Sequence, residues 1–567
     1  MVSPRLTAVL WPRAACACLR TRGQVAGSLA RGGRCGRWHA EARQPGVAGV
    51  RALGPGLRTA WADTRREATW GDIAAVCLLT AVASFVYLHS FRSGMDLLDE
   101  GFEYQLASRI LQGEVPYRNF FTVVTPLAFY WQALLIALFG PGMIVGRTAN
   151  LLCGVATAVL LYLVGRRLAG RPLALLAALA AIPWGVPWWP QPNYSWYVIL
   201  LELMAAWAAL RATEGRGRWW SVGLWAAAAV LTKQNVGLAT AGALGLYAVW
   251  RGGWAGVRGY AIGLAAPLAA LAGYLGAVGA LGAFWYDTVS FAFAHFPSAA
   301  RIGYPPVGPL LTALARGRGG PQALVTYLPQ AVLAAGLLVL VAGAVRRRPW
   351  LPEGVLAWCL TLAGLTIAYP RSDFVHIDYA LAPAFLGLGW LLWRLCGGRR
   401  WLLPLPALLL VALTTAAWPR NLGWRFSGGG VPIGVPRTAG LRVSPGVAAM
   451  MRAVVAGIDR TVPPGKPVLI LPWANLFYYL ADRPNPTPYD LDITLNMPPG
   501  GNTQIAAILA RTHCPVFYWP HSGISAPFSV YGAPVLAELR AHYRLSGQVG
   551  PFQIWRWNGG RLTAGSA

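Results

Sequence analysis

Eleven long apolar runs, separated by short basic or polar connectors, constrain the fold of this chain more than any other feature. A helix needs about 20 residues to cross the hydrocarbon core of a bilayer, and the shorter runs must extend into their flanks to reach this length. The runs cover residues 71–91, 144–164, 173–189, 194–210, 219–232, 236–250, 260–284, 327–345, 354–369, 379–395 and 401–418. The pattern predicts an all-α polytopic membrane domain with about 11–13 transmembrane helices.

The composition indicates the same class of protein. Of the 567 residues, 56% are hydrophobic and only 12% are charged, whereas soluble domains carry about a quarter charged residues. The formal net charge of +28 would by itself suit a nucleic-acid-binding protein. However, the positive charge lies in small Arg clusters between the apolar runs, which is typical of the cytoplasmic loops of membrane proteins. We therefore exclude nucleic acid as a partner and expect the lipid bilayer instead.

The distribution of Arg sets the orientation, because positively charged connectors stay in the cytoplasm. With a cytoplasmic N-terminus, eleven crossings and a juxtamembrane or re-entrant helix at 126–140, nearly every Arg cluster falls on the cytoplasmic side. A full crossing at 126–140 would invert every later connector. The clusters are Arg166, Arg167 and Arg171; Arg211, Arg216 and Arg218; Arg251 and Arg258; Arg346, Arg347 and Arg348; and Arg394, Arg399 and Arg400. We expect a multi-pass protein of the bacterial inner (plasma) membrane, with the acidic first loop outside.

The two ends of the chain differ from its middle. Residues 1–67 are rich in Arg, Gly and Ala without a clean apolar run, so we expect a disordered basic extension, with an upstream start codon or a transit peptide as alternatives. After the membrane domain (68–420), residues 421–443 form a predicted Gly/Pro-rich linker. Residues 444–567 are predicted to form a small extracytoplasmic α/β domain. Its expected helices are 447–458, 476–480, 503–511 and 534–543, and its expected strands are 467–471, 516–519 and 552–557.

Four of the chain's 20 acidic residues lie within eight positions after the first apolar run: Asp96, Asp99, Glu100 and Glu103. Carboxylates at the mouth of a membrane span are costly to hold there unless they bind or react with something. The spacing of apolar residues predicts a helix over 102–111, and Asp99 and Glu103 share one face because they are four residues apart. The alternative is a solvated connector, but almost no Lys or Arg lies nearby to balance this charge. We therefore interpret the cluster as functional.

Three cations are predicted on the same membrane side as the acidic cluster, namely Lys233, Arg371 and His376. Arg is a natural partner for phosphate because its planar fork donates two hydrogen bonds. Each residue also has a plainer interpretation. Lys233 can extend from a helix end to the interface, Arg371 can pair with Asp373, and His376 can cap a span. Together with the acidic cluster, the three cations indicate a site for a phosphate-bearing substrate at the outer surface.

Several short motifs follow one another along the chain. The first loop reads DEGFEY at 99–104 and ILQGEVPYRNFF at 110–121. The later motifs are TPL at 125–127, GR at 146–147, LTKQ at 231–234, YPR at 369–371 with His376 and Pro383 after it, and DRPNPT at 482–487. This order resembles the GT-C class of integral membrane glycosyltransferases, the group of protein O-mannosyltransferases and aminoarabinose lipid A transferases. The resemblance extends over residues 71–557.

The resemblance implies a reaction. Such enzymes pass a sugar from a polyprenyl phosphate to an extracytoplasmic acceptor (a glycolipid, polysaccharide or protein), usually with inversion. Asp99 matches the catalytic Asp of the first loop, the general base for the acceptor hydroxyl, and Glu100 follows it in the same motif. Lys233, Arg371 and His376 would stabilise the departing lipid phosphate. Glu103 and Tyr104 would contribute to substrate binding.

One departure from the family pattern concerns the donor. In the aminoarabinose transferases a Lys precedes the Pro-Pro-Leu run, whereas Val124 and Thr125 occupy that place here. A phosphate contact carried by that Lys must come from elsewhere, or the donor differs. We expect no cofactor, and the eight Cys show no metal-ligand spacing. A carboxylate site for Mg²⁺ or Mn²⁺ formed by Asp96, Asp99 and Glu103 is the alternative.

Two other functions compete with this prediction. An oligosaccharide polymerase or ligase would place its chemistry in the loop 285–326 and make Asp99 dispensable. A transporter or flippase for lipid-linked sugars would show internal repeats and polar sites at the membrane midplane. The chain has no convincing repeat, and its ionisable residues fall at the ends of spans.

Overall fold

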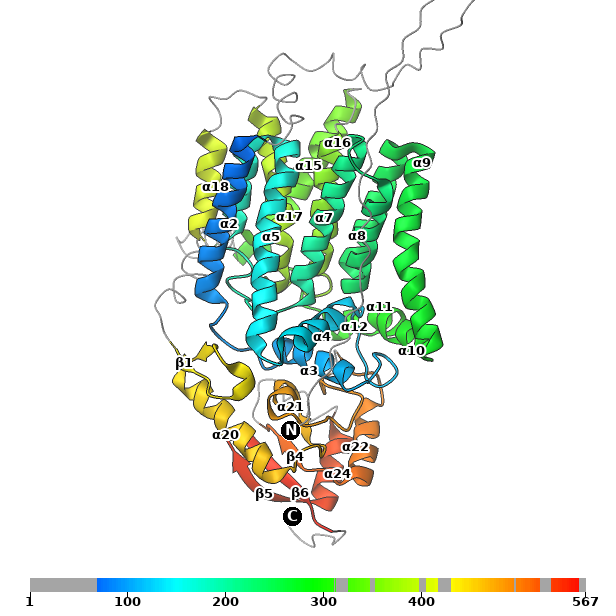
Figure 1. The fold of residues 1–567 in the computed structure, drawn as a ribbon, viewed down its shortest axis with the longest axis vertical. Helices are drawn as coiled ribbons and strands as arrows, with labels where there is room; N and C mark the ends of the chain where they lie inside the picture. Colours follow the sequence, from blue (N-terminus) through cyan, green and yellow to red (C-terminus); the bar gives the residue numbers. More distant parts are fainter. Residues whose placement is uncertain are drawn as a thin grey trace, which may run out of the picture. The chain divides into compact units, whose positions relative to one another are not determined.

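Within the part of the chain that the structure describes, ten apolar helices form a bundle in the computed structural model. Figure 1 shows the labelled helices of this bundle side by side. The ten helices are α2 (Trp70–Ser90), α5 (Met143–Ala169), α6 (Arg171–Ala181), α7 (Tyr194–Thr213), α8 (Trp219–Thr232), α9 (Gln234–Ala277), α15 (Leu328–Val345), α16 (Pro352–Leu365), α17 (Phe374–Cys396) and α18 (Pro404–Ala416). Six of them, α2, α5, α7, α9, α15 and α17, are long and apolar enough to cross a membrane. The shorter apolar helices α6, α8, α16 and α18 lie among them.

The structure describes residues 69–309, 312, 325–346, 352–396, 404–416, 430–493, 496–520 and 532–559. All of them belong to one compact unit, residues 52–567. The predicted N-terminal extension, residues 1–67, lies outside the described residues.

Helix α9 accounts for two of the predicted runs, because it contains a break. Gly253 has a φ of 56°, a backbone conformation that favours glycine and ends regular helix. The two halves of α9 fold back on each other, and the Tyr260 hydroxyl donates a hydrogen bond to the Ala241 carbonyl at 2.6 Å. Counting these halves separately, the described helices match the eleven predicted apolar runs, which confirms the polytopic all-α prediction.

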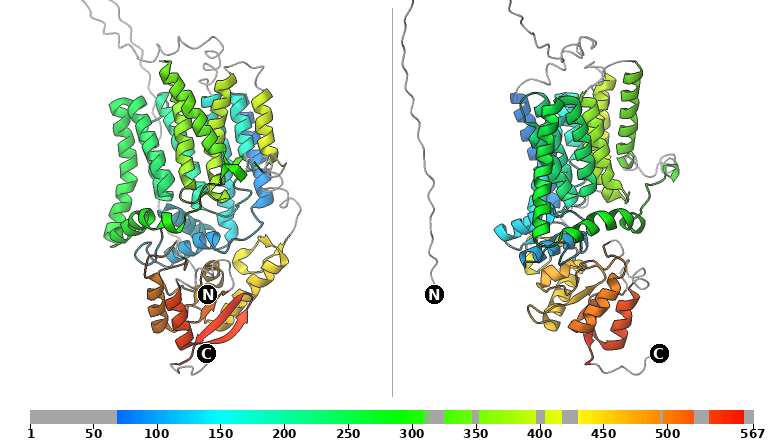
Figure 2. Two further views of the ribbon diagram at one scale, coloured as in Figure 1. Left: turned by 180° about the vertical axis from the view of Figure 1, so that it is seen from behind. Right: turned by 90° about the vertical axis from the view of Figure 1, so that its right-hand side faces the viewer.

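Helices α3 (Asp99–Leu111) and α4 (Leu127–Phe139) lie across one end of this bundle. The views in Figure 2 place them between the long helices and the C-terminal strands. The arrangement of α4 agrees with the prediction that the segment 126–140 does not cross the membrane. Short pieces of helix follow α9 at the same end: α10 (Leu281–Trp285), the π-helix η2 (Tyr286–Phe291), α11 (Ala292–Ala294) and α12 (Phe296–Ala299).

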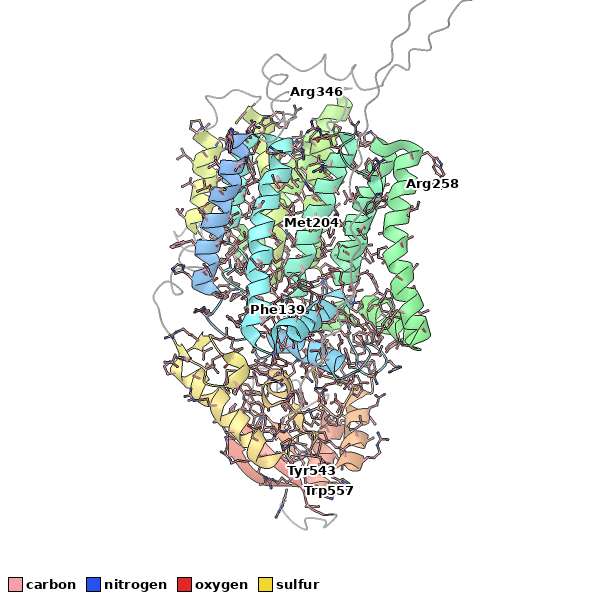
Figure 3. All side chains as sticks on the ribbon, in the orientation of Figure 1. Phe139, Met204, Arg258, Arg346, Tyr543 and Trp557 are labelled. Atoms are coloured by element: carbon pink, nitrogen blue, oxygen red, sulfur yellow. The ribbon has the colours of Figure 1, made fainter. Side chains whose placement is uncertain are left out.

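The basic connectors gather at the opposite end of the bundle. Figure 3 labels Arg258 and Arg346 there, far from the C-terminal strands. At that end the buried Asp72 of α2 forms ion pairs with Arg166 at 2.7 Å and Arg171 at 2.9 Å. The two ends of the bundle therefore differ in charge, as the orientation argument requires.

The C-terminal region is a small α/β unit, as predicted. Its helices are α20 (Pro445–Thr461), α21 (Leu476–Ala481), α22 (Gly501–Thr512) and α24 (Ala533–His542), and its sheet has the order β3 (Leu469–Leu471), β4 (Val516–Tyr518), β6 (Phe552–Trp557), β5 (Tyr543–Val549). Strands β3 and β4 are parallel, and the other pairs are antiparallel.

The sequence did not reveal three of the strands. Strand β5 is largely exposed and polar, so it lacks the apolar alternation that marks a strand. The described part of the expected linker contains the two-residue strands β1 (Val431–Pro432) and β2 (Arg442–Val443), which pair with each other. The short 3₁₀-helix η6 (Pro436–Thr438) lies between them.

Helix α3 and the C-terminal region share a hydrophobic core. Tyr104 of α3 packs in one cluster with Phe477 and Tyr479 of α21, and Phe102 packs in another with Leu471 of β3. Arg109 of α3 adds a buried ion pair with Asp490 at 2.9 Å. These contacts hold the C-terminal region against the helix that begins with Asp99.

Candidate active site

Helix α3 begins at Asp99 because Asp96 caps its first turn. One Asp96 carboxylate oxygen, Oδ1, accepts hydrogen bonds from the backbone N–H groups of Leu98 at 2.8 Å and Asp99 at 2.5 Å. These are groups that a helix N-terminus leaves without an intrahelical partner. The capped turn directs the Asp99 side chain into a cavity between the bundle and the C-terminal region.

The cavity has a volume of about 720 Å³, within the usual range for small-molecule sites. Residues from distant parts of the chain line it, from the first loop, the helical bundle and the C-terminal region. The ionisable ones are Asp96, Asp99, Lys233, Arg371, Asp373 and His376. The lining also includes Phe102, Val123, Val124, Trp189, Tyr194, Phe293, Phe296, Tyr369, Tyr379, Trp473, Leu491, Ile493 and Asn496.

Lys233 reaches the cavity from the turn between α8 and α9. Its backbone is extended, with φ −155° and ψ 109°, so the chain reverses direction there. The Lys233 ammonium donates a hydrogen bond to the Ser195 hydroxyl at 2.9 Å and lies 4.9 Å from the centre of the Tyr194 ring. These contacts hold the cation at the cavity, where the Lys233 side chain is half-buried.

Arg371 and His376 are held together by Asp373. One Asp373 carboxylate oxygen lies 3.1 Å from an Arg371 guanidinium nitrogen, and the other lies 2.7 Å from His376 Nδ1. The segment is anchored to the loop before α15, since Ser372 N–H donates to the Ile302 carbonyl at 2.9 Å. Thus Arg371 forms the loop ion pair considered from the sequence and lines the cavity as well.

The charged groups around the cavity shift the pKa values of its carboxylates in opposite directions. Burial raises the pKa of Asp99 to about 7, and the neighbouring Asp96 carboxylate adds to this rise. The cations Arg371 and Lys233 act in the opposite direction on the same pKa. Burial also acts to raise the pKa of Asp373, but its contacts with His376 and Arg371 outweigh burial and lower it to about 2. The pKa of Asp99 therefore lies much closer to neutral pH than the pKa of Asp373.

The structure does not place Glu100 and Tyr104 at the cavity. The Glu100 carboxylate is fully buried against Arg147, with oxygen–nitrogen distances of 2.8 and 2.7 Å. The Tyr104 hydroxyl donates a hydrogen bond to the Met143 carbonyl inside the core. Both residues attach α3 to α5, so their contacts are structural.

Glu103 lies one turn after Asp99 but is not part of the cavity lining. Its carboxylate accepts a hydrogen bond from the backbone N–H of Tyr194 at 2.9 Å. Burial raises the pKa of Glu103 to about 8. Glu103 thus holds the backbone at Tyr194, whose ring lies beside the Lys233 ammonium.

The residues considered for a metal do not form a ligand set. Asp96 is engaged in capping α3, and Glu103 is directed to Tyr194. Within the described ranges, no group of three or more His, Cys, Asp or Glu side chains lies close enough to hold a metal ion.

Several lining residues were not predicted from the sequence. Trp473, Leu491, Ile493 and Asn496 come from the C-terminal region and reach the cavity only because this region packs on α3. From the loop 285–326, the described residues Phe293 and Phe296 contribute to the lining. None of these positions carries a local pattern that distinguishes it from other apolar or polar residues.

Comparison with known proteins agrees with this architecture. Residues 123–275 match the family model of dolichyl-phosphate-mannose-protein mannosyltransferases. The crystal structure of ArnT from Cupriavidus metallidurans bound to undecaprenyl phosphate is similar to this chain with a TM-score of 0.53. The identity is 14%, and the match covers 86% of this chain and 98% of that one. This chain therefore has the fold of the GT-C class of membrane glycosyltransferases.

A second solved structure shows the same fold. The oligosaccharyltransferase of Archaeoglobus fulgidus tethered with an acceptor peptide has a TM-score of 0.50 and 12% identity, and the match covers 85% of this chain and 74% of that one. A comparison with curated proteins gave no match. The fold that the resemblance of the sequence motifs to the GT-C class implied is thus confirmed.

Proposed function

We propose that this GT-C enzyme transfers a sugar from a polyprenyl-phosphate donor to a hydroxyl group of an extracytoplasmic acceptor, with inversion at the anomeric carbon. The observation that carries the proposal is the single cavity in which Asp99 faces Lys233, Arg371 and His376. A base and a set of cations are the two elements that this reaction requires. The similar ArnT structure holds undecaprenyl phosphate, a lipid phosphate of the proposed class.

In the proposed reaction, Asp99 accepts the proton of the acceptor hydroxyl as its oxygen attacks the anomeric carbon. The bond between that carbon and the donor phosphate oxygen breaks, and its electron pair leaves with the polyprenyl phosphate. Proton removal by a positioned carboxylate contributes about 10²–10⁴-fold to such a rate. A base with a pKa of about 7 is well matched to this task near neutral pH.

The cations would stabilise the departing phosphate. Arg371 offers a planar fork for two phosphate oxygens, and Lys233 adds a point charge. Asp373 keeps Arg371 and His376 in place at the cavity. Charge stabilisation by preorganised donors is usually a large part of the acceleration in such sites.

We assign Glu100, Glu103 and Tyr104 as positioning residues. Glu100 and Tyr104 attach α3 to α5, and Glu103 orients Tyr194 beside Lys233. The Arg-rich end of the bundle would face the cytoplasm. The cavity and the C-terminal region would then lie on the extracytoplasmic side, for which we propose the bacterial inner membrane.

The proposal is tested with the full-length protein in proteoliposomes and a panel of radiolabelled undecaprenyl-phosphate sugars, by following the release of undecaprenyl phosphate. Asp99→Asn should lower the rate of transfer by about 10²–10⁴-fold and leave binding of undecaprenyl phosphate intact. Arg371→Ala should weaken that binding. Asp459→Asn is the matched control, because Asp459 is an exposed carboxylate on α20. Full activity of Asp99→Asn would refute the mechanism and favour a polymerase or ligase that does not use Asp99.

A further inference from the structure

The carboxyl end of strand β3 in the C-terminal region lies at the cavity. Strands β3 and β4 run parallel, with Leu471 opposite Tyr518. A Trp follows each strand within two residues, Trp473 after β3 and Trp519 after β4. In open α/β sheets, ligands bind in the crevice outside the carboxyl ends of the strands. Trp473 lines the cavity at this edge.

Trp519 supports the ring of Trp473. The two indole rings are stacked with their centres 5.1 Å apart and an angle of 27° between their planes. The Trp519 backbone N–H donates to the Leu471 carbonyl at 3.0 Å, and its ring lies 5.4 Å from the buried ring of Phe552. The flat surface that Trp473 contributes to the cavity is therefore held from behind by the core of the domain.

The neighbouring lining residues are uncharged. Leu491, Ile493 and Asn496 come from the segment beside Trp473. The backbone N–H of Asp492 donates to the Pro472 carbonyl at 2.8 Å and holds this segment in place. An aromatic ring and two aliphatic side chains fit the apolar C–H face of a pyranose, and the Asn496 amide can both donate to and accept from sugar hydroxyls.

The surface formed by Trp473, Leu491, Ile493 and Asn496 has a defined position relative to Asp99. Helix α3 touches the segment after Trp473 so closely that a Cβ on Gly101 would lie 2.6 Å from the Leu476 backbone nitrogen. In an inverting displacement the nucleophile attacks from the side opposite the leaving group. Lys233 and Arg371 belong to the helical bundle, whereas Trp473 belongs to the C-terminal region. The acceptor therefore belongs on the Trp473 side.

We propose that Trp473, with Leu491, Ile493 and Asn496, forms the acceptor subsite, and that the acceptor is a carbohydrate whose ring stacks on the Trp473 indole. This inference rests on the proposed glycosyl transfer and specifies its acceptor class. A Ser or Thr side chain of a protein has no ring face to place against the indole and would leave this surface unused.

The test is saturation-transfer-difference NMR on the full-length protein in lipid nanodiscs. The probes are methyl gluco-, galacto- and mannopyranosides, a blocked threonine tripeptide, and undecaprenyl phosphate. The variants are Trp473→Ala, Trp473→Phe and the matched control Trp557→Ala. Trp557 lies in β6 away from the cavity (Figure 3). Its ring stacks on His513, with ring centres 3.8 Å apart. Thermal unfolding of each variant verifies that it is folded.

At least one pyranoside should bind to the wild type and to Trp557→Ala, and its binding should be about tenfold weaker in Trp473→Ala, the effect of losing one aromatic contact. Trp473→Phe should retain most of the binding and show that the variant site is folded. Pyranoside binding by Trp473→Ala equal to that of the wild type would overturn the inference. Binding that is lost in Trp557→Ala but kept in a correctly folded Trp473→Phe would show dependence on Trp557 and would overturn it as well. Trp473-dependent binding of the tripeptide without any pyranoside binding would also overturn it, in favour of a protein acceptor.

Undecaprenyl phosphate separates this inference from the donor proposal. Its binding should be unchanged in Trp473→Ala and weakened in Arg371→Ala. If the wild type binds undecaprenyl phosphate but no pyranoside, the acceptor subsite is refuted and the donor proposal stands. If pyranosides bind through Trp473 while undecaprenyl phosphate does not bind at all, the subsite is supported and the donor proposal fails.

Discussion

Separating Glu100 from Arg147 is predicted to destabilise the protein rather than to remove a catalytic group. The side chains of both residues are completely buried, and the ion pair is 2.7 Å long. Arg147 also donates hydrogen bonds to three backbone carbonyls of the segment that leads into α3, those of Phe91, Ser93 and Gly94. The guanidinium therefore connects α5 to both the acidic loop and the end of α2.

The magnitude differs between the two partners. Arg147→Met leaves the Glu100 carboxylate buried without its countercharge, which costs about 3–5 kcal/mol of unfolding free energy. The same change removes the donor from three carbonyls, so the loss should lie at the upper end of this range. Glu100→Gln keeps an acceptor for Arg147 and leaves the carbonyl contacts intact. It also leaves the buried guanidinium without its countercharge, so it should cost about 3 kcal/mol, the lower end of the same range.

The assay is unfolding of the purified protein in detergent, followed by sugar transfer measured at a temperature at which each variant is folded. Asp482→Asn is the control, because the Asp482 carboxylate of the Asp482–Arg437 pair is largely exposed and its loss should cost less than about 1 kcal/mol. A folded Glu100→Gln variant should retain transfer within about tenfold of the wild type. A folded but inactive Glu100→Gln variant would refute the structural role and restore Glu100 as a catalytic candidate. Wild-type stability of Arg147→Met would refute the energetic argument.

Two further predictions concern the base and the attachment of the C-terminal region. The deprotonated form of Asp99 is the proposed base, and its pKa is about 7. The rate of transfer should therefore rise about tenfold per pH unit below pH 7 and level off above it. A flat profile between pH 5 and 7 would contradict this assignment. Gly101→Ala should cost about 1–3 kcal/mol, because the added Cβ would lie 2.4 Å from Asn475 Oδ1 and 2.6 Å from the Leu476 nitrogen. Its control is Gly242→Ala, because the space around Gly242 is open. This variant should gain about 0.5–1 kcal/mol in free energy of unfolding. Equal unfolding midpoints for the two variants would show that α3 is not in tight contact with the segment before α21.

The roles of the acidic residues in the first loop depend on contacts between distant parts of the chain, and no local sequence pattern reveals these contacts. Asp99, Glu100 and Glu103 lie within five positions, yet only Asp99 lines the cavity. Glu100 points to Arg147, and Glu103 points to the Tyr194 backbone. Asp99 and Glu103 do share a helix face, as their spacing requires, but the neighbours of that face are supplied by α7 and the loop before α17.

The sequence alone determined the class of fold, because the hydrophobic effect and backbone hydrogen bonding act locally on long apolar runs. It also identified Asp99, Lys233, Arg371 and His376 as candidates, since carboxylates at the mouth of a span are costly and the three basic residues fall on the same membrane side. Only the tertiary structure decided which carboxylate faces the cations and that the C-terminal region closes the cavity with Trp473. The physical reason is that these choices depend on how α3 packs against the segment around Leu476, more than 370 positions later in the chain.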